Sequence, residues 1–144
     1  MTVRATTRTA KTTWQGSLAE GAGSVELQSS GVGSFDVSWP SRSEEANGKT
    51  SPEELIAAAH SSCFSMALSA GLSKAGTPPT TLETSAEVEL TVGTGITGIK
   101  ITVRGTVEGI TEEQFVEAAE GAKANCPVSK ALAGTTITLD AALA

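Results

Sequence analysis

The sequence predicts an α+β fold in a single domain spanning residues 1–144. Three observations point to it: short segments of alternating polarity at the N-terminus, one long uncharged helix in the middle, and a mixture of alternating segments and helices after it. The order of these elements lacks the regular strand–helix–strand alternation that builds a parallel sheet. With 39% hydrophobic and 18% charged residues, the chain has the composition of a domain that folds around a core.

The N-terminal region is rich in threonine, serine and glycine. Its polarity alternates over residues 6–14, 24–29 and 34–39, and glycines separate these segments, so we expect three short antiparallel strands. The polar segment 40–50 that follows carries charges of both signs. We expect it to form a loop with a functional or partner-binding role.

A long helix is predicted to begin at Pro52. Ser51 is a suitable N-cap, Pro52 suits the first helical position, and Glu54 completes a capping box. We expect the helix to reach about Ala75, and its residues 55–73 include no charged side chain. A helix of this kind has to be buried on most of its faces, which a chain of 144 residues can hardly achieve alone. The sequence therefore predicts a homodimer in which a second copy covers part of the helix.

The second half of the chain returns to alternating polarity. Residues 82–92 and 96–107 predict a hairpin around a glycine-rich turn. Capping residues predict a helix over 111–125, and a short helix should run from Cys126 and Pro127 to about residue 133. A closing strand is expected over 135–141.

The charge and the N-terminus limit the classes of function. A net charge of −6 with scattered basic residues argues against a nucleic-acid partner. The uncharged stretch 55–73 contains His60 and several serines, so we expect a core helix and no membrane span. No apolar segment typical of a signal peptide opens the chain, and we expect a cytoplasmic protein.

The two cysteines are the candidates for chemistry. Cys63 lies in the middle of the long helix, where it is either an inert core thiol or a redox thiol that needs a cationic neighbour. Cys126 precedes Pro127 and so stands at a helix N-cap, a setting that favours a thiolate. Only His60 could join them as a third metal ligand, and we expect neither a metal nor another cofactor.

Two segments resemble the cysteine motifs of the OsmC/Ohr family of hydroperoxide reductases. Residues 52–68 (PEELIAAAHSSCFSMAL) are similar to the cysteine-helix motif, and 125–129 (NCPVS) to the second cysteine motif. Residues 14–16 and 137–139 also fit the family, so the resemblance covers nearly the whole chain. The Ala-Ala-His sequence before the first cysteine is closer to the osmotically inducible branch.

The resemblance implies an intertwined α+β homodimer with two active sites at the subunit interface. It implies that Cys63 attacks the peroxide and becomes a sulfenic acid, and that Cys126 resolves it as a disulfide, which an external thiol or dithiol reduces. Organic hydroperoxides are the implied substrates, with hydrogen peroxide as a further candidate. Glu53 matches the glutamate of the family motif.

An activating arginine is also implied, shortly before the cysteine helix. Arg42 is the arginine at that place, whereas the early segment 16–23 contains none. The alternative is a solvated arginine paired with Glu44 or Glu45; Arg104 and Arg8 would then be the next candidates for activation.

Helix geometry adds a constraint on the expected site. Glu53 and Cys63 are ten residues apart, about 15 Å along one helix. If Glu53 orients the arginine that activates Cys63, either the guanidinium bridges this distance or the glutamate comes from the partner subunit.

Two other functions fit the residues. The chain could be a small-molecule-binding, stress-protective protein with non-catalytic thiols, because an uncharged helix can line an apolar cavity. It could also be a thiol hydrolase or transferase in which His60 acts as base for Cys63, which requires a hydrogen bond between the two side chains. A packed core or interface histidine is the simpler interpretation of His60.

Overall fold

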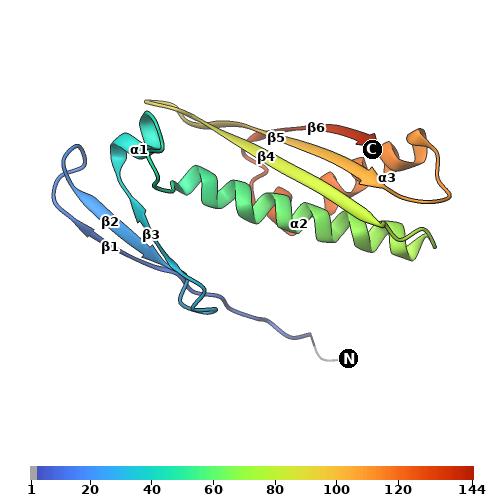
Figure 1. The fold of residues 1–144 in the computed structure, drawn as a ribbon, viewed down its shortest axis with the longest axis horizontal. Helices are drawn as coiled ribbons and strands as arrows, with labels where there is room; N and C mark the ends of the chain where they lie inside the picture. The colour runs from blue at the N-terminus through green and yellow to red at the C-terminus, as the bar shows by residue number, and fades with distance from the viewer. Residues whose placement is uncertain (1–2) are drawn as a thin grey trace. The chain divides into compact units, whose positions relative to one another are not determined.

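The computed structural model describes residues 3–144 and confirms the α+β fold class (Figure 1). The chain divides into two compact units, Met1–Pro52 and Glu53–Ala144. Each unit holds one three-stranded sheet. The predicted order of strands and helices is confirmed, with one additional short helix in the N-terminal unit.

The N-terminal unit contains an antiparallel sheet in the order β1-β2-β3. The strands are β1 (Lys11–Gln15), β2 (Ala22–Glu26) and β3 (Ser34–Val37). All three are shorter than predicted, because alternation of polarity continues into residues that do not pair. The predicted antiparallel arrangement itself is confirmed.

The additional helix is α1 (Trp39–Ser43), in a region expected to be a strand end and a loop. Ser38 ends the strand and caps the helix: its Oγ accepts the N–H of Ser41 at 3.3 Å, and the Ser41 Oγ accepts the N–H of Ser38 at 3.2 Å. Pro40 in the first turn fits the helix as well. The loop prediction was wrong here because a capping box closed by serine lacks the usual Glu or Gln.

In the C-terminal unit, α2 (Pro52–Lys74) lies along the hairpin formed by β4 (Thr81–Thr91) and β5 (Gly95–Thr106) (Figure 1). All three elements agree with the prediction to within one or two residues. The hairpin alternates between outward, exposed side chains and inward, partly buried ones. Its inward face packs against the helices.

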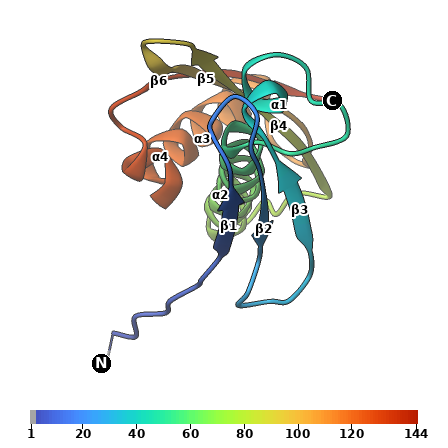
Figure 2. The same cartoon turned by 90° about the vertical axis from the view of Figure 1, so that its left-hand side faces the viewer.

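The remaining elements are α3 (Glu112–Asn125), α4 (Pro127–Ala131) and β6 (Thr136–Leu143). Thr111 caps α3 in a capping box with Gln114. Strand β6 pairs with β5 in parallel, so α3 and α4 form the crossover between parallel strands. The predicted order of elements contained no parallel unit, so the parallel β5–β6 pair departs from the prediction. Helices α2 and α3 lie on the same face of the sheet (Figure 2).

Within this chain, α2 is buried on one face only. Its buried residues after the first turn recur every four positions: His60, Phe64, Leu68 and Leu72. An exposed α2 stripe with the same spacing lies on another face: Ala58, Ser62, Met66 and Ala70. In the described part of the chain, α2 is the one helix that is long and apolar enough to cross a membrane, a property that core helices of soluble proteins share.

Gly105 makes room for the ring that closes the core. Phe115 of α3 is fully buried, and a Cβ at Gly105 would lie 2.5 Å from its Cε1 and 2.6 Å from its Cζ. We expect Gly105→Ala to lower the free energy of unfolding by about 1–3 kcal/mol, because a buried ring would have to move. Urea unfolding measures this. Gly121→Ala, on an exposed part of α3 with no atom near the added Cβ, is the control and should be neutral or stabilising.

Candidate active site

The structure brings the two cysteines together in the C-terminal unit. Cys63 lies in the middle of α2, and Cys126 stands between α3 and α4 as the end of one and the cap of the other. Their Sγ atoms are 3.0 Å apart, and the Cys126 thiol donates a hydrogen bond to the Cys63 sulfur. Since the sulfurs of a disulfide lie about 2.05 Å apart, the distance between them has to shorten by about 1 Å when oxidation forms the bond.

The turn around Cys126 ends α3 and begins α4. The N–H of Cys126 donates to the carbonyl of Ala122 at 2.8 Å and closes α3, while Lys130 N–H donates to the Cys126 carbonyl at 3.0 Å and opens α4. Pro127 occupies the first helical position, as predicted. The N–H groups of Val128 and Ser129, in the first turn of α4, are among the groups that favour the thiolate form of Cys126.

Hydrogen bonding decides the protonation of Cys126. Burial works to raise the pKa of Cys126, but the hydrogen bonds to its sulfur outweigh burial and lower that pKa below its ordinary value. The causes that lower this pKa, largest first, are hydrogen bonding by the Cys63 thiol, the Ser129 N–H, the Ser129 hydroxyl and the Val128 N–H. Cys126 is therefore the first of the pair to become a thiolate, and once it has lost its proton the direction of the hydrogen bond reverses, so that Cys63 donates to it.

Cys63 differs from Cys126 in both its pKa and its exposure to solvent. Burial raises the pKa of Cys63, the hydrogen bond to Cys126 and the charge of Cys126 raise it further, and the N–H of Val128 opposes them. Cys63 is nevertheless partly exposed, whereas Cys126 is fully buried. A molecule arriving from solvent thus meets the Cys63 sulfur first. Cys63 therefore needs a cation nearby to become the reactive thiolate, as predicted from its place in the middle of a helix.

His60 is a buried side chain that bonds to Ser129. Its Nε2 lies 2.8 Å from the Ser129 Oγ, and burial lowers the pKa of the ring. The hydrolase alternative requires a hydrogen bond between His60 and Cys63, but within residues 3–144 the sulfur of Cys63 bonds to Cys126 and the ring bonds to Ser129. The packed-histidine interpretation is confirmed, and the sequence held no signal for its partner.

The other predicted site residues lie at the ends of the first two helices. Glu53 is buried in the first turn of α2, at 7% exposure. Arg42 lies in the last turn of α1, its guanidinium carbon 5.9 Å from the centre of the Trp39 ring. Arg42 and the cysteines belong to different compact units, so its role stays a prediction. Arg104, a fallback candidate, pairs with Asp140 at 3.1 Å.

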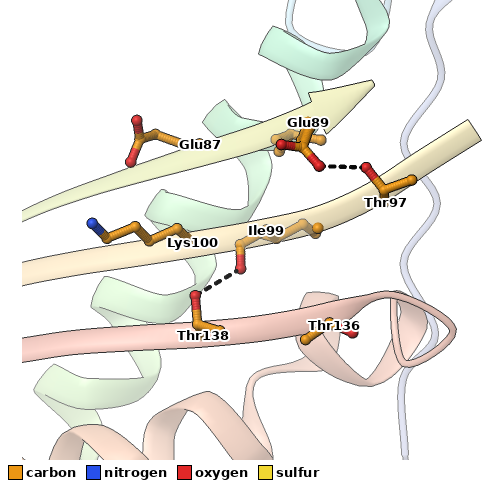
Figure 3. A pocket seen from close by; sticks show the side chains of 9 residues that line it. Glu87, Glu89, Thr97, Ile99, Lys100, Thr136 and Thr138 are labelled. Carbon is orange, nitrogen blue, oxygen red and sulfur yellow. Dashed lines mark hydrogen bonds between the residues drawn. The ribbon is translucent and has the colours of Figure 1, made fainter. Parts of the chain in front are cut away.

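A hollow of about 440 Å³ lies away from the cysteines, on the outer face of the sheet β4-β5-β6 (Figure 3). Its labelled polar side chains come from all three strands: Glu87, Glu89, Thr97, Lys100, Thr136 and Thr138. Thr97 donates to the Glu89 carboxylate, and Thr138 donates to the Ile99 carbonyl at 3.5 Å. Neither cysteine lines this hollow, so it is not part of the candidate thiol site.

Comparison with known proteins gives a consistent result. The family model described as OsmC-like protein matches residues 45–140. The chain is 42% identical over 130 residues to Peroxiredoxin OsmC of Escherichia coli (strain K12), an alignment that covers 88% of this chain and 90% of that protein. The organic hydroperoxide resistance protein OhrB of Bacillus subtilis has a similar structure, with a TM-score of 0.72 and 28% identity, covering 92% of this chain and 97% of that one. A structure from Legionella pneumophila, an organic hydroperoxide resistance protein OsmC, superposes with a TM-score of 0.76 at 23% identity, covering 97% of this chain and 99% of that one.

Proposed function

Because the chain belongs to the OsmC-like protein family, we propose that it is a cysteine-based peroxidase that reduces organic hydroperoxides at the expense of an external thiol or dithiol. The observation that carries the proposal is the distance of 3.0 Å between the sulfurs of Cys63 and Cys126. Two thiols this close, one accessible and one buried, suit a cycle in which the first is oxidised and the second completes a disulfide.

In this cycle the Cys63 thiolate attacks one peroxide oxygen. The O–O bond breaks, Cys63 becomes a sulfenic acid, and the released alkoxide takes up a proton as the alcohol. Cys126 as thiolate then attacks the oxidised sulfur, and hydroxide leaves as water after protonation. An external dithiol restores both thiols by exchange. The balance is one hydroperoxide and one dithiol consumed, with one alcohol, one water and one oxidised dithiol formed.

Arg42 is our candidate for the cation that Cys63 requires. Its guanidinium would attract the negative charge from the Cys126 sulfur to that of Cys63, with the proton moving the other way along their hydrogen bond. Glu53, a carboxylate buried in the first turn of α2, would hold the guanidinium in place. The fork of the guanidinium would also bind the peroxide oxygens.

A peroxide-consumption assay tests the proposal directly. Reduced protein is mixed with an alkyl hydroperoxide or with hydrogen peroxide, and dithiothreitol is the reductant. We expect catalytic turnover with one dithiol oxidised per peroxide, and faster turnover of the alkyl hydroperoxide. The alternative of a binding protein with non-catalytic thiols predicts no turnover with either peroxide and an ordinary pKa at both cysteines.

We also propose that a second copy covers the exposed α2 stripe, giving the homodimer. Met66 at the middle of this stripe is 72% exposed, and a groove of about 510 Å³ beside it runs to the start of β4. Light scattering should give twice the mass of the chain at micromolar concentration. Met66→Arg should shift the protein toward monomers, because a charge in a buried interface lacks a partner.

The matched control for the dimer is Val92→Arg, which places the same charge on another exposed apolar residue, in the β4–β5 turn. We expect the control to remain dimeric. A folded wild-type monomer at micromolar concentration would contradict the proposal.

Two broader expectations belong to the same proposal. We infer that residues 1–144 act as one functional domain, since the family match begins before the boundary between the compact units and continues past it. We also place the protein in the cytoplasm, where a reductant pool would return the disulfide to thiols.

A further inference from the structure

His60 and Ser129 are buried polar residues that lie next to the two cysteines. His60 is fully buried, and its Nε2 is 2.8 Å from the Oγ of Ser129. Ser129 is 6% exposed and lies three residues after Cys126 in the first turn of α4, and its hydroxyl is among the groups that lower the pKa of Cys126. Cys126 in turn contacts the sulfur of Cys63. The structure thus holds two hydrogen-bonded pairs, His60 with Ser129 and Cys126 with Cys63, and the first turn of α4 places Ser129 close to Cys126.

The tautomer of His60 decides which atom donates in its hydrogen bond with Ser129. Burial lowers the pKa of the ring, so near neutral pH it is uncharged and carries one N–H. Among the described residues, Nδ1 of His60 is the one buried side-chain nitrogen or oxygen without a hydrogen-bond partner. A proton on Nδ1 would leave a buried N–H unsatisfied, whereas a proton on Nε2 donates to Ser129 and leaves Nδ1 as an unpaired acceptor, which folded proteins tolerate more often than an unpaired N–H. With Nε2–H as the donor, the hydroxyl hydrogen of Ser129 is available to Cys126.

We propose that Ser129 and His60 are positioning residues for the resolving step: His60 Nε2–H orients the Ser129 hydroxyl, and the hydroxyl donates its hydrogen to the Cys126 thiolate. This inference rests on the proposed peroxidase cycle. In the resolving step the Cys126 thiolate attacks the sulfur of the Cys63 sulfenic acid. The S–S bond forms, the S–O bond breaks, and the hydroxide that leaves is protonated to water. Cys63 is reduced and Cys126 oxidised, so no outside electrons are needed.

Few other side chains around Cys126 could donate a hydrogen bond to its sulfur in place of Ser129. On α3, Lys123 pairs with Glu120 at 3.8 Å, and Lys130 on α4 is exposed. Strands β5 and β6 contribute Ile101, Val103 and Leu139, among others, to the hydrophobic cluster that includes Cys126. The two side chains whose hydrogen bonding lowers the pKa of Cys126 are Cys63 and Ser129, and Cys63 has lost its thiol proton when it attacks peroxide. The O–H of the sulfenic acid belongs to the group that leaves in the resolving step, whereas the Ser129 hydroxyl stays in place throughout it.

A titration without peroxide tests the contact of Ser129. In a Cys63→Ser background, thiolate absorbance near 240 nm as a function of pH reports Cys126 alone. Ser129→Ala should raise the pKa of Cys126 by about one unit, the size expected for losing one hydrogen bond to a charged sulfur. The matched control is Ser65→Ala, which removes a hydroxyl bonded to Thr84 at 2.7 Å and should leave the titration unchanged. An unchanged titration in Ser129→Ala would overturn the proposal.

The part played by His60 is tested by a double-mutant cycle in the same background. His60→Leu removes the donor to Ser129 and should raise the pKa of Cys126 by less than Ser129→Ala does, and His60→Gln, which keeps an N–H, should reverse part of the rise. Once Ser129 is alanine, neither substitution should have a further effect. An equal shift with and without the hydroxyl would show that His60 does not act through Ser129. If His60→Leu does not fold, as judged by circular dichroism, His60→Gln provides the same comparison.

Single-turnover kinetics separate the proposed role of Ser129 and His60 from the proposed peroxidase activity. With Cys63 restored, Ser129→Ala should form the sulfenic acid within about twofold of the wild-type rate. Disulfide formation should be about tenfold slower near neutral pH, in line with one pKa unit, and dimedone should trap more sulfenic acid at Cys63. Equal slowing of both steps would indicate general disruption and overturn the proposal. If the wild type itself does not react with peroxide, the proposed function fails, while the titration still decides whether the Ser129 contact exists.

Discussion

Replacing Cys63 by serine is expected to reduce peroxide consumption to the background of the dithiol alone. Cys63 is the partly exposed thiol of the pair, and serine cannot form a sulfenic acid. Replacing Cys126 by serine should have a different outcome: one peroxide is consumed for each chain, and turnover then slows because no second sulfur can close the disulfide. A stopped-flow burst followed by steady-state consumption measures both effects.

Mass spectrometry is the control for this pair of variants. Cys126→Ser should accumulate sulfenic acid or its higher oxides at residue 63, whereas Cys63→Ser should leave Cys126 reduced, because the buried sulfur is shielded from solvent. Equal and mild losses of activity in the two variants would contradict the assignment of roles, and the reverse pattern would make Cys126 the attacking thiol.

Replacing Arg42 by alanine should raise the pKa of Cys63 by one unit or more. Burial and the neighbouring Cys126 already raise the pKa of Cys63, so the reactive thiolate depends on a compensating cation. A shift of one unit corresponds to about 1.4 kcal/mol and to about tenfold less thiolate at a pH below the pKa. The peroxide step should slow by the same factor at neutral pH and recover as the pH rises through the new pKa. Lysine should restore part of the rate, because it supplies charge without the planar fork.

The measurement is the pH dependence of alkylation at Cys63, with peptide mass spectrometry separating it from Cys126. Arg104→Ala is the matched control, since Arg104 is committed to Asp140, and it should leave the profile unchanged. An unchanged profile in Arg42→Ala would remove Arg42 from the site, and a shifted profile in the control would transfer the role to Arg104.

The elements of this fold with strong local signals could be predicted from the sequence. The start of α2 at Pro52 and the cap of α3 at Thr111 depend on residues within one turn, and both positions are confirmed. Cys126 as cap of α4 followed from Pro127 in the same way. Helix α1 was missed because serine takes the place of Glu or Gln in its capping box.

Features that depend on distant residues could not be predicted from local pattern. The pairing of β6 with β5 is decided by the crossover between them, not by the residues of either strand. His60 and Ser129 are 69 residues apart, and neither has a neighbour in sequence that indicates the other. The approach of Cys63 and Cys126 was expected only from the family resemblance, and here the structure agrees.

The closeness of the two sulfurs also has a consequence for the conformational stability of the chain. Residues 63 and 126 are 63 positions apart, so a bond between them closes a large loop within the C-terminal unit. Loop-closure entropy predicts that such a cross-link disfavours the unfolded chain by about 4 kcal/mol. The proposed cycle therefore alternates between a cross-linked fold and an open one of lower stability. The disulfide form of the protein would therefore resist unfolding and proteolysis better than the dithiol form.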